Sequence, residues 1–161
     1  MVIILMGVSG AGKTVIGQRL AKELSWPFYE GDDFHPPANV EKMRQGIALA
    51  DEDRDPWLAR LQCLIRELLR KDQSAVVTCS ALKQSYRDRL RDGVQDVCFV
   101  YLKGDSDLIR RRLQDRRGHF MNPNLLASQF ATLEEPVGVL TIDVARQPED
   151  IVQHIKRKLG L

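Results

Sequence analysis

Short apolar runs alternate with longer amphipathic stretches along the whole chain. The apolar runs have the length and composition of strands buried on both faces of a parallel sheet. They cover residues 2–6, 27–29, 75–79, 97–102 and 139–142. Between these runs, apolar side chains recur at the three- and four-residue spacing of a helix. The predicted helices cover 13–24, 39–45, 80–91 and 122–133, and others follow Asp55-Pro56, Asp105 and Pro148.

This alternation predicts one α/β domain over residues 1–161, with three αβα layers around a five-stranded parallel sheet. Ligands of such sheets bind beyond the carboxyl ends of the strands, so the segments that follow the strands are the place to look for a site. Asp55 and Pro56 have the residue types of an N-cap and a first helical position, and we expect a helix to begin there.

Composition narrows the class of protein. The 161 residues include 24 Lys and Arg against 22 Asp and Glu, a net charge of +2 that gives no reason to expect a nucleic-acid or membrane partner. The three cysteines are odd in number and lack CxxC spacing, which favours a reducing compartment over a disulfide framework or a zinc site. The N-terminus lacks the basic region of a signal peptide, and no apolar run approaches a membrane span. We therefore expect a soluble, cytoplasmic protein.

The clearest motif follows the first apolar run. Gly7 to Thr14 reads GVSGAGKT, which matches the phosphate-loop pattern GxxxxGK[ST] between a strand and a helix. Backbone N–H groups of such a loop, together with the positive end of the helix, bind phosphate oxygens. Lys13 would reach the β- and γ-phosphates, and the Thr14 hydroxyl would bind Mg²⁺. The alternative is a glycine-rich turn that matches by chance. The expected phosphate-binding residues are Gly7, Ser9, Gly10, Ala11, Gly12, Lys13 and Thr14.

Acidic residues at the end of the second run suggest where the phosphoryl group goes. Glu30, Asp32 and Asp33 follow that strand, whereas the third run ends in Cys79-Ser80 without an acid. A carboxylate at this edge can accept a hydroxyl proton, or hold Mg²⁺ through water, although it could also simply cap the following helix. The chain is shorter than motors and switches usually are, so the pattern favours a small-molecule kinase.

Cationic residues are candidates for binding an anionic acceptor. Arg54 lies within the acidic stretch 51–55 and could form a bidentate pair with a carboxylate. Lys83 and Arg87 are four residues apart, so we expect them on one helix face that either binds an anion or is merely solvated.

Five arginines lie between residues 110 and 117. The balanced charge elsewhere argues against a nucleic-acid patch. A mobile lid over about 112–125, which neutralises charge in the transition state and excludes water, fits better. We expect Arg110 and Arg111 to be solvated.

Together these blocks resemble the gluconate kinases of the small phosphate-loop type, nearly from end to end. GVSGAGKT at Gly7 is followed by GDDFHPPANVEKMRQG at Gly31 and DEDRDPWL at Asp51. CSALKQSYRDRLR at Cys79 and RRGHFMNPNLLASQFATLEEP at Arg116 complete the series. The order of the HP, KM, DRDPWL, CSALK, HFM and SQF blocks is far more specific than the phosphate loop alone, which shikimate and nucleotide kinases share.

The resemblance implies transfer of a phosphoryl group from ATP to the 6-hydroxyl of D-gluconate, with Mg²⁺ as cofactor. It also implies a nucleoside-monophosphate-kinase-like core with strand order 2-3-1-4-5, an acceptor-binding segment over about 31–58, and a homodimer. Two residues depart from the family pattern: Glu30 replaces a common Asp, which puts its share in metal binding in doubt, and Ala48 replaces a common Pro. The runner-up is a kinase for another small anionic acceptor, such as shikimate or a related sugar acid. A nucleotide-binding regulatory protein without transfer activity is a further alternative.

The resemblance also assigns site residues. Lys13, Asp32 and Arg116 are implied as catalytic, with Asp32 as the base, and Asp32 or Glu30 as a water-mediated metal ligand beside Thr14. The implied substrate-binding residues are Asp32, His35, Arg54, Lys83, Arg87 and His119. The further nucleotide-binding residues are Arg112, Arg116, Gln147 and Pro148.

Overall fold

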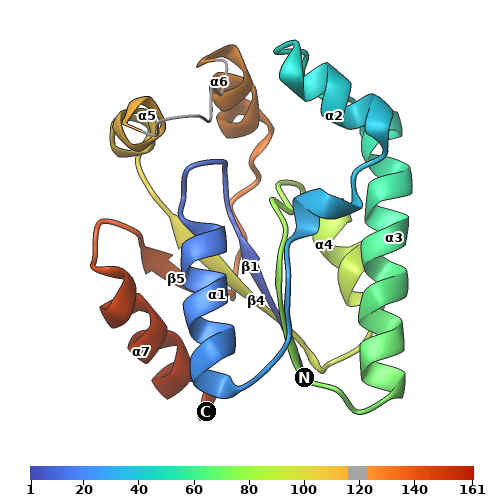
Figure 1. The fold of residues 1–161 in the computed structure, drawn as a ribbon, viewed down its shortest axis with the longest axis vertical. Helices are drawn as coiled ribbons and strands as arrows, with labels where there is room; N and C mark the ends of the chain where they lie inside the picture. The colour runs from blue at the N-terminus through green and yellow to red at the C-terminus, as the bar shows by residue number, and fades with distance from the viewer. Residues whose placement is uncertain (116–122) are drawn as a thin grey trace.

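A computed structural model describes residues 1–115 and 123–161, and its centre is a parallel sheet (Figure 1). All four strand pairings are parallel, and the strand order is β2-β3-β1-β4-β5, which confirms the predicted architecture. The strands are β1 (Val2–Met6), β2 (Phe28–Tyr29), β3 (Ala75–Thr78), β4 (Val97–Lys103) and β5 (Leu140–Asp143).

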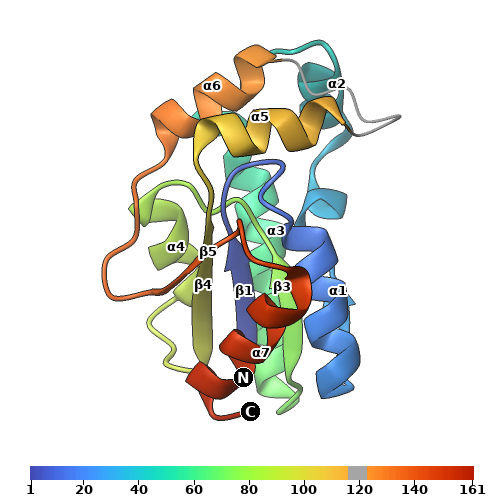
Figure 2. The same cartoon turned by 90° about the vertical axis from the view of Figure 1, so that its left-hand side faces the viewer.

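Helices cover both faces of the sheet and the end at which its strands finish. Figures 1 and 2 show α1 and α7 on one face, α3 and α4 on the other, and α2, α5 and α6 gathered beyond the carboxyl ends of the strands. The helices are α1 (Lys13–Leu24), η1 (Gly31–Phe34, a 3-10 turn), α2 (Pro37–Arg44), α3 (Asp51–Arg70), α4 (Gln84–Arg91), α5 (Ser106–Gln114), α6 (Pro123–Thr132) and α7 (Pro148–Leu159). None of the helices over the described ranges is long and apolar enough to cross a membrane.

The position of β1 at the centre of the sheet explains why its sequence is continuously apolar. All five residues of β1 are fully buried, and successive side chains point to opposite faces. Ile3 and Leu5 pack in the cluster formed with α1 and α7. Val2, Ile4 and Met6 pack in the cluster formed with α3 and α4. Because both faces of β1 are covered, the loop that follows it is held at a fixed position on the carboxyl edge.

The predicted start of α3 is wrong. The helix begins at Asp51 rather than after Asp55, and Pro56 lies inside it. Asp53, the third helical residue, accepts a hydrogen bond from the Ala50 N–H at 2.9 Å and so closes the helix end earlier. Pro56 removes one N–H from the helical ladder, but the buried face that begins at Trp57 stabilises the helix across it.

The predicted start of α4 is also wrong. Ser80 to Lys83 form a loop in which Ala81 has a left-handed backbone with φ of 44°, and the helix begins at Gln84. The Ser80 carbonyl accepts a hydrogen bond from the Gly7 N–H at 3.3 Å, which ties this loop to the phosphate loop. Lys83 therefore precedes α4 and does not share a helix face with Arg87.

Candidate active site

The loop between β1 and α1 has the backbone of a phosphate-binding loop. Gly10 and Gly12 adopt φ angles of 82° and 92°, which glycine tolerates better than any other residue. The Lys13 ammonium donates to the carbonyls of Gly7 and Val8, at 3.0 and 2.9 Å. The loop thus presents its amides beside the amino end of α1, an arrangement that suits a polyphosphate.

Helix α6 reaches the same loop through Gln129. Its side-chain oxygen accepts from the Ser9 N–H at 2.7 Å, and its amide nitrogen lies 3.4 Å from the Ser9 hydroxyl. Gln129 belongs to the SQF block, but no pattern in the sequence assigned it a role. Its contact places α6 over the mouth of the loop.

Glu30 links the phosphate loop to the neighbouring strand. Its carboxylate accepts from the Thr14 hydroxyl at 2.6 Å and, through its other oxygen, from the hydroxyl of the fully buried Thr78. Mg²⁺ prefers oxygen ligands and usually takes one or two carboxylates together with substrate phosphates and water. The Thr14 hydroxyl and the Glu30 carboxylate supply that chemistry beside the phosphate loop, so they fit the expected metal.

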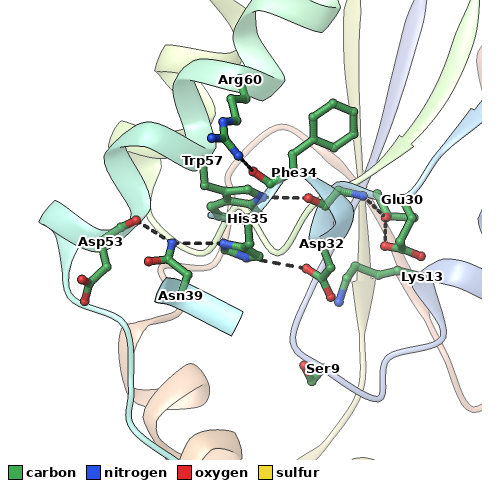
Figure 3. Close-up of polar contacts among 12 residues, drawn as sticks. Ser9, Lys13, Glu30, Asp32, Phe34, His35, Asn39, Asp53, Trp57 and Arg60 are labelled. Carbon is green, nitrogen blue, oxygen red and sulfur yellow. Dashed lines mark hydrogen bonds and ion pairs between the residues drawn. The ribbon is translucent and has the colours of Figure 1, made fainter. Parts of the chain in front are cut away.

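The carboxylate predicted to face the acceptor, Asp32, lies on the turn η1. Asp32 is exposed toward the cavity, and its Oδ1 lies 3.9 Å from Nε2 of the buried His35 (Figure 3). The His35 ring stacks on Trp57 with a centroid distance of 4.2 Å and an interplanar angle of 16°. Trp57 in turn donates its indole N–H to the Gly31 carbonyl at 2.8 Å. These contacts fix the imidazole relative to the turn that carries Asp32.

Burial keeps His35 neutral. Desolvation, followed by the positive charge of Arg54, lowers the pKa of His35 from its usual 6.5 to about 4. Between these two pH values the unfolded chain binds a proton that the folded protein does not. Stability is therefore unaffected above about pH 6.5 and falls as the pH drops toward 4.

A comparison of His35→Gln with the wild type tests this dependence. We expect urea unfolding between pH 4.5 and 6.5 to show up to one fewer proton bound on unfolding in the variant. Its free energy of unfolding should decline less steeply with acid than that of the wild type, whatever its absolute value. Equal slopes would show that His35 is not held neutral by the fold.

Arg54 is the cation whose positive charge contributes to the lowered pKa of His35. Its side chain is 9% exposed, and Nη1 donates to the Tyr86 hydroxyl at 3.2 Å. The Tyr86 hydroxyl donates to Asp51, whose two carboxylate oxygens also accept from Lys83 at 2.9 and 2.8 Å. Lys83 is therefore neutralised by Asp51, whereas Arg54 keeps a guanidinium edge available to the cavity that it lines.

The Arg87 guanidinium is engaged in hydrogen bonds within the protein. It is 3% exposed, and its Nη1 donates to the carbonyls of Ala81 and Leu82 at 2.8 and 3.1 Å. The prediction that Lys83 and Arg87 share one helix face is wrong, because Lys83 lies before α4 and Arg87 donates to carbonyls of the preceding loop. Neither side chain lines the main cavity.

One cavity of about 690 Å³ unites the two halves of the site. The phosphate loop contributes Ser9, Gly10, Gly12, Lys13 and Thr14 to its wall. The opposite wall comes from the segment expected to bind the acceptor, and it includes Asp32, His35, Arg54 and Trp57. Further lining residues are Ser80 and Leu82 of the loop after β3, and Leu113, Leu125, Ser128 and Gln129 of α5 and α6. Gly7 and Ala11 belong to the loop but lie outside the lining.

Other predicted residues lie apart from this cavity or outside the described part of the chain. Arg112 donates to the Val144 carbonyl at 2.5 Å, which brings it to the loop that leads to Gln147 and Pro148 at the start of α7. None of these three lines the cavity. Arg116 and His119 fall outside the described residues, as does the middle of the expected lid.

Comparisons with known proteins agree with this architecture. A family model described as AAA domain matches residues 2–136. The crystal structure of a sugar kinase from Janibacter sp. HTCC2649 superposes with a TM-score of 0.93 at 41% identity, over 99% of this chain and 94% of that one. The structure of a gluconokinase from Sinorhizobium meliloti 1021 superposes with a TM-score of 0.88 at 43% identity, over 98% of this chain and 90% of that one.

A phosphate loop that faces an acceptor carboxylate across one cavity, on this parallel sheet, defines a phosphate-loop kinase of a small molecule. The thermosensitive gluconokinase of Escherichia coli (strain K12) is 46% identical over 96% of this chain and 84% of its own length. The chain belongs to the gluconokinase family.

Proposed function

We propose that the protein transfers the γ-phosphoryl group of ATP to the 6-hydroxyl of D-gluconate and releases 6-phospho-D-gluconate and ADP. The observation that carries the proposal is the shared cavity, in which Lys13 of the phosphate loop and the Asp32 carboxylate face the same space. Membership of the gluconokinase family supports gluconate as the acceptor.

Each side chain has a role suited to its position. Lys13 stabilises the negative charge on the transferring phosphoryl group, and Asp32 orients the attacking hydroxyl and accepts its proton. Thr14, with Glu30 or Asp32 through water, would hold Mg²⁺, which would supply charge neutralisation at the phosphates. Because transfer passes through a loose transition state, positioning and charge neutralisation account for most of the catalysis.

The remaining assignments follow the resemblance to the family. Arg116 is assigned to stabilising the transferring phosphoryl group, and His119 to binding the acceptor. Arg112, Gln147 and Pro148 border the nucleotide, which the proximity of Arg112 to Val144 supports. We also propose a cytoplasmic homodimer that has no nucleic-acid or membrane partner.

An acceptor panel tests the proposed function. ADP release is measured with D-gluconate, shikimate, related sugar acids and no acceptor, at fixed ATP and Mg²⁺. We expect D-gluconate to give the highest kcat/KM, with little release in its absence. A higher value for another acid would identify the runner-up, and ATP binding without acceptor-dependent release would indicate a regulatory protein.

Arg54 is our choice for the cation that binds the gluconate carboxylate, because it lines the cavity whereas Lys83 and Arg87 do not. Removal of a charge-assisted hydrogen bond costs about 1.5–3 kcal/mol, so Arg54→Met should raise the gluconate KM roughly 10- to 150-fold with little effect on the ATP KM. Lys83→Met is the matched control, since Lys83 already pairs with Asp51. A larger effect on KM in Lys83→Met than in Arg54→Met would move the carboxylate contact to Lys83.

A further inference from the structure

The amide of Asn39, on α2, has an orientation fixed by its neighbours (Figure 3). Asn39 is 3% exposed, and its Nδ2 lies 2.7 Å from the backbone carbonyl of Asp53 on α3. A carbonyl oxygen only accepts hydrogen bonds, so the amide group that faces it must be the NH₂. The second hydrogen of that NH₂ is directed to Nδ1 of His35, at 3.2 Å.

This contact decides which nitrogen of His35 carries the proton. Because the Asn39 NH₂ can only donate, Nδ1 must present its lone pair. A neutral imidazole then carries its proton on Nε2. Burial of the ring and the nearby positive charge of Arg54 both disfavour the imidazolium, which agrees with a single proton on the ring.

The Nε2–H group faces the acceptor side of the cavity. Nε2 lies 3.9 Å from Asp32 Oδ1, a distance too long for a direct hydrogen bond. A hydroxyl oxygen beside both groups would accept from Nε2–H and donate to the carboxylate, so that both of its hydrogen-bonding functions are satisfied. If the proton were on Nδ1 instead, Nε2 and the Asp32 carboxylate would both be hydrogen-bond acceptors. The hydroxyl between them would then have no donor.

We propose that Asn39 is a positioning residue that holds His35 in the Nε2–H tautomer, so that His35 and Asp32 form a donor–acceptor pair for a hydroxyl group of the acceptor. The inference rests on the proposed function, because it takes Asp32 as the carboxylate that faces the acceptor. The stacking of His35 on Trp57 sets the plane of the imidazole ring, and Asn39 sets which ring nitrogen carries the proton.

The first test reads the tautomer directly in the unliganded full-length protein. Long-range ¹H–¹⁵N correlation spectra distinguish a protonated ring nitrogen from an unprotonated one, and His35→Gln assigns the His35 signals. We expect the wild type to show an unprotonated Nδ1 and a protonated Nε2. Asn39→Asp places a carboxylate acceptor at Nδ1 and should protonate it, whereas Asn39→Ala removes the donor and should give a mixture of tautomers. The partly exposed His154 serves as the internal control, with signals that should not change.

The second test compares kinetics. Asn39→Asp and Asn39→Ala should each lower kcat/KM for gluconate roughly ten-fold, the effect of losing about one substrate hydrogen bond, while the Kd for ATP stays the same. A wild-type His35 protonated on Nδ1, or a tautomer that neither variant alters, would overturn the inference whatever the acceptor. An altered tautomer with unchanged gluconate kinetics would overturn the hydroxyl pairing. A wild type with the expected tautomer but no activity on gluconate would instead refute the proposed function.

Discussion

Lys13→Met should reduce gluconate-dependent ADP release by about 10²–10³-fold or more. Deletion of one electrostatic contact to a transition state costs that much in comparable sites, and the lysine contributes a full charge. In the structure its ammonium is held by two carbonyls of the phosphate loop, within reach of the space that the phosphates would occupy. Methionine keeps most of the side-chain length, so the loss is one of charge.

Lys22→Met is the matched control for this experiment. Lys22 is an exposed lysine in the last turn of the same helix, α1, and its removal should leave kcat and both KM values near those of the wild type. Thermal unfolding of both variants would establish that they are folded. A folded Lys13→Met enzyme with wild-type turnover would contradict the role of the phosphate loop.

Asp32→Asn should lower kcat by about 10²–10⁴-fold, the usual contribution of a positioned general base. The amide keeps the shape of the carboxylate but cannot take a proton from the attacking hydroxyl. The Asp32 carbonyl, which accepts from the His35 N–H at 3.2 Å, is unaffected by the change. Single-turnover kinetics would measure the transfer step, and equilibrium binding should give an unchanged Kd for ATP.

Asp33→Asn provides the comparison. Asp33 lies on the same 3-10 turn, is also exposed and also lines the cavity, so its replacement removes the same charge from nearly the same place. A small effect at Asp33 beside a large one at Asp32 would separate proton transfer from general electrostatics. Equal effects, or near-normal turnover in Asp32→Asn, would remove Asp32 from the role of base.

The sequence correctly predicted those elements that depend on residues close together in the chain. The continuously buried strand β1, the Asp105 cap that accepts from the Leu108 N–H at 2.9 Å, and the phosphate loop all follow from residues adjacent in the chain. The predicted starts of α3 and α4 were wrong because another local interaction outweighed the expected start signal. Because Asp53 accepts a hydrogen bond from the Ala50 N–H, α3 begins before Asp55-Pro56. Because Ala81 has a left-handed backbone, α4 begins later than expected.

The acceptor side of the site was harder to predict because it depends on tertiary contacts. His35 was expected there, but its partners Asn39 and Trp57 were not, since they meet it only when α2 and α3 pack together. The spacing of His35 and Asn39, four residues apart beside the start of a helix, is the one signal that could have paired them. Lys83 and Arg87 were misjudged because their sequence spacing matched a helix that begins later.

The hydroxyl of Thr78 connects Glu30, which contacts the phosphate loop, with the turn that carries Asp32. It donates to Glu30 on the nucleotide side and accepts, at 2.9 Å, from the Gly31 N–H that begins the acceptor turn. A Cβ on residue 31 would lie 1.9 Å from the Thr78 carbonyl oxygen, so only glycine permits this approach. Because the Glu30 carboxylate and the Gly31 backbone are both anchored to this one residue of β3, the partner of Thr14 and the turn that carries Asp32 keep a fixed position relative to each other.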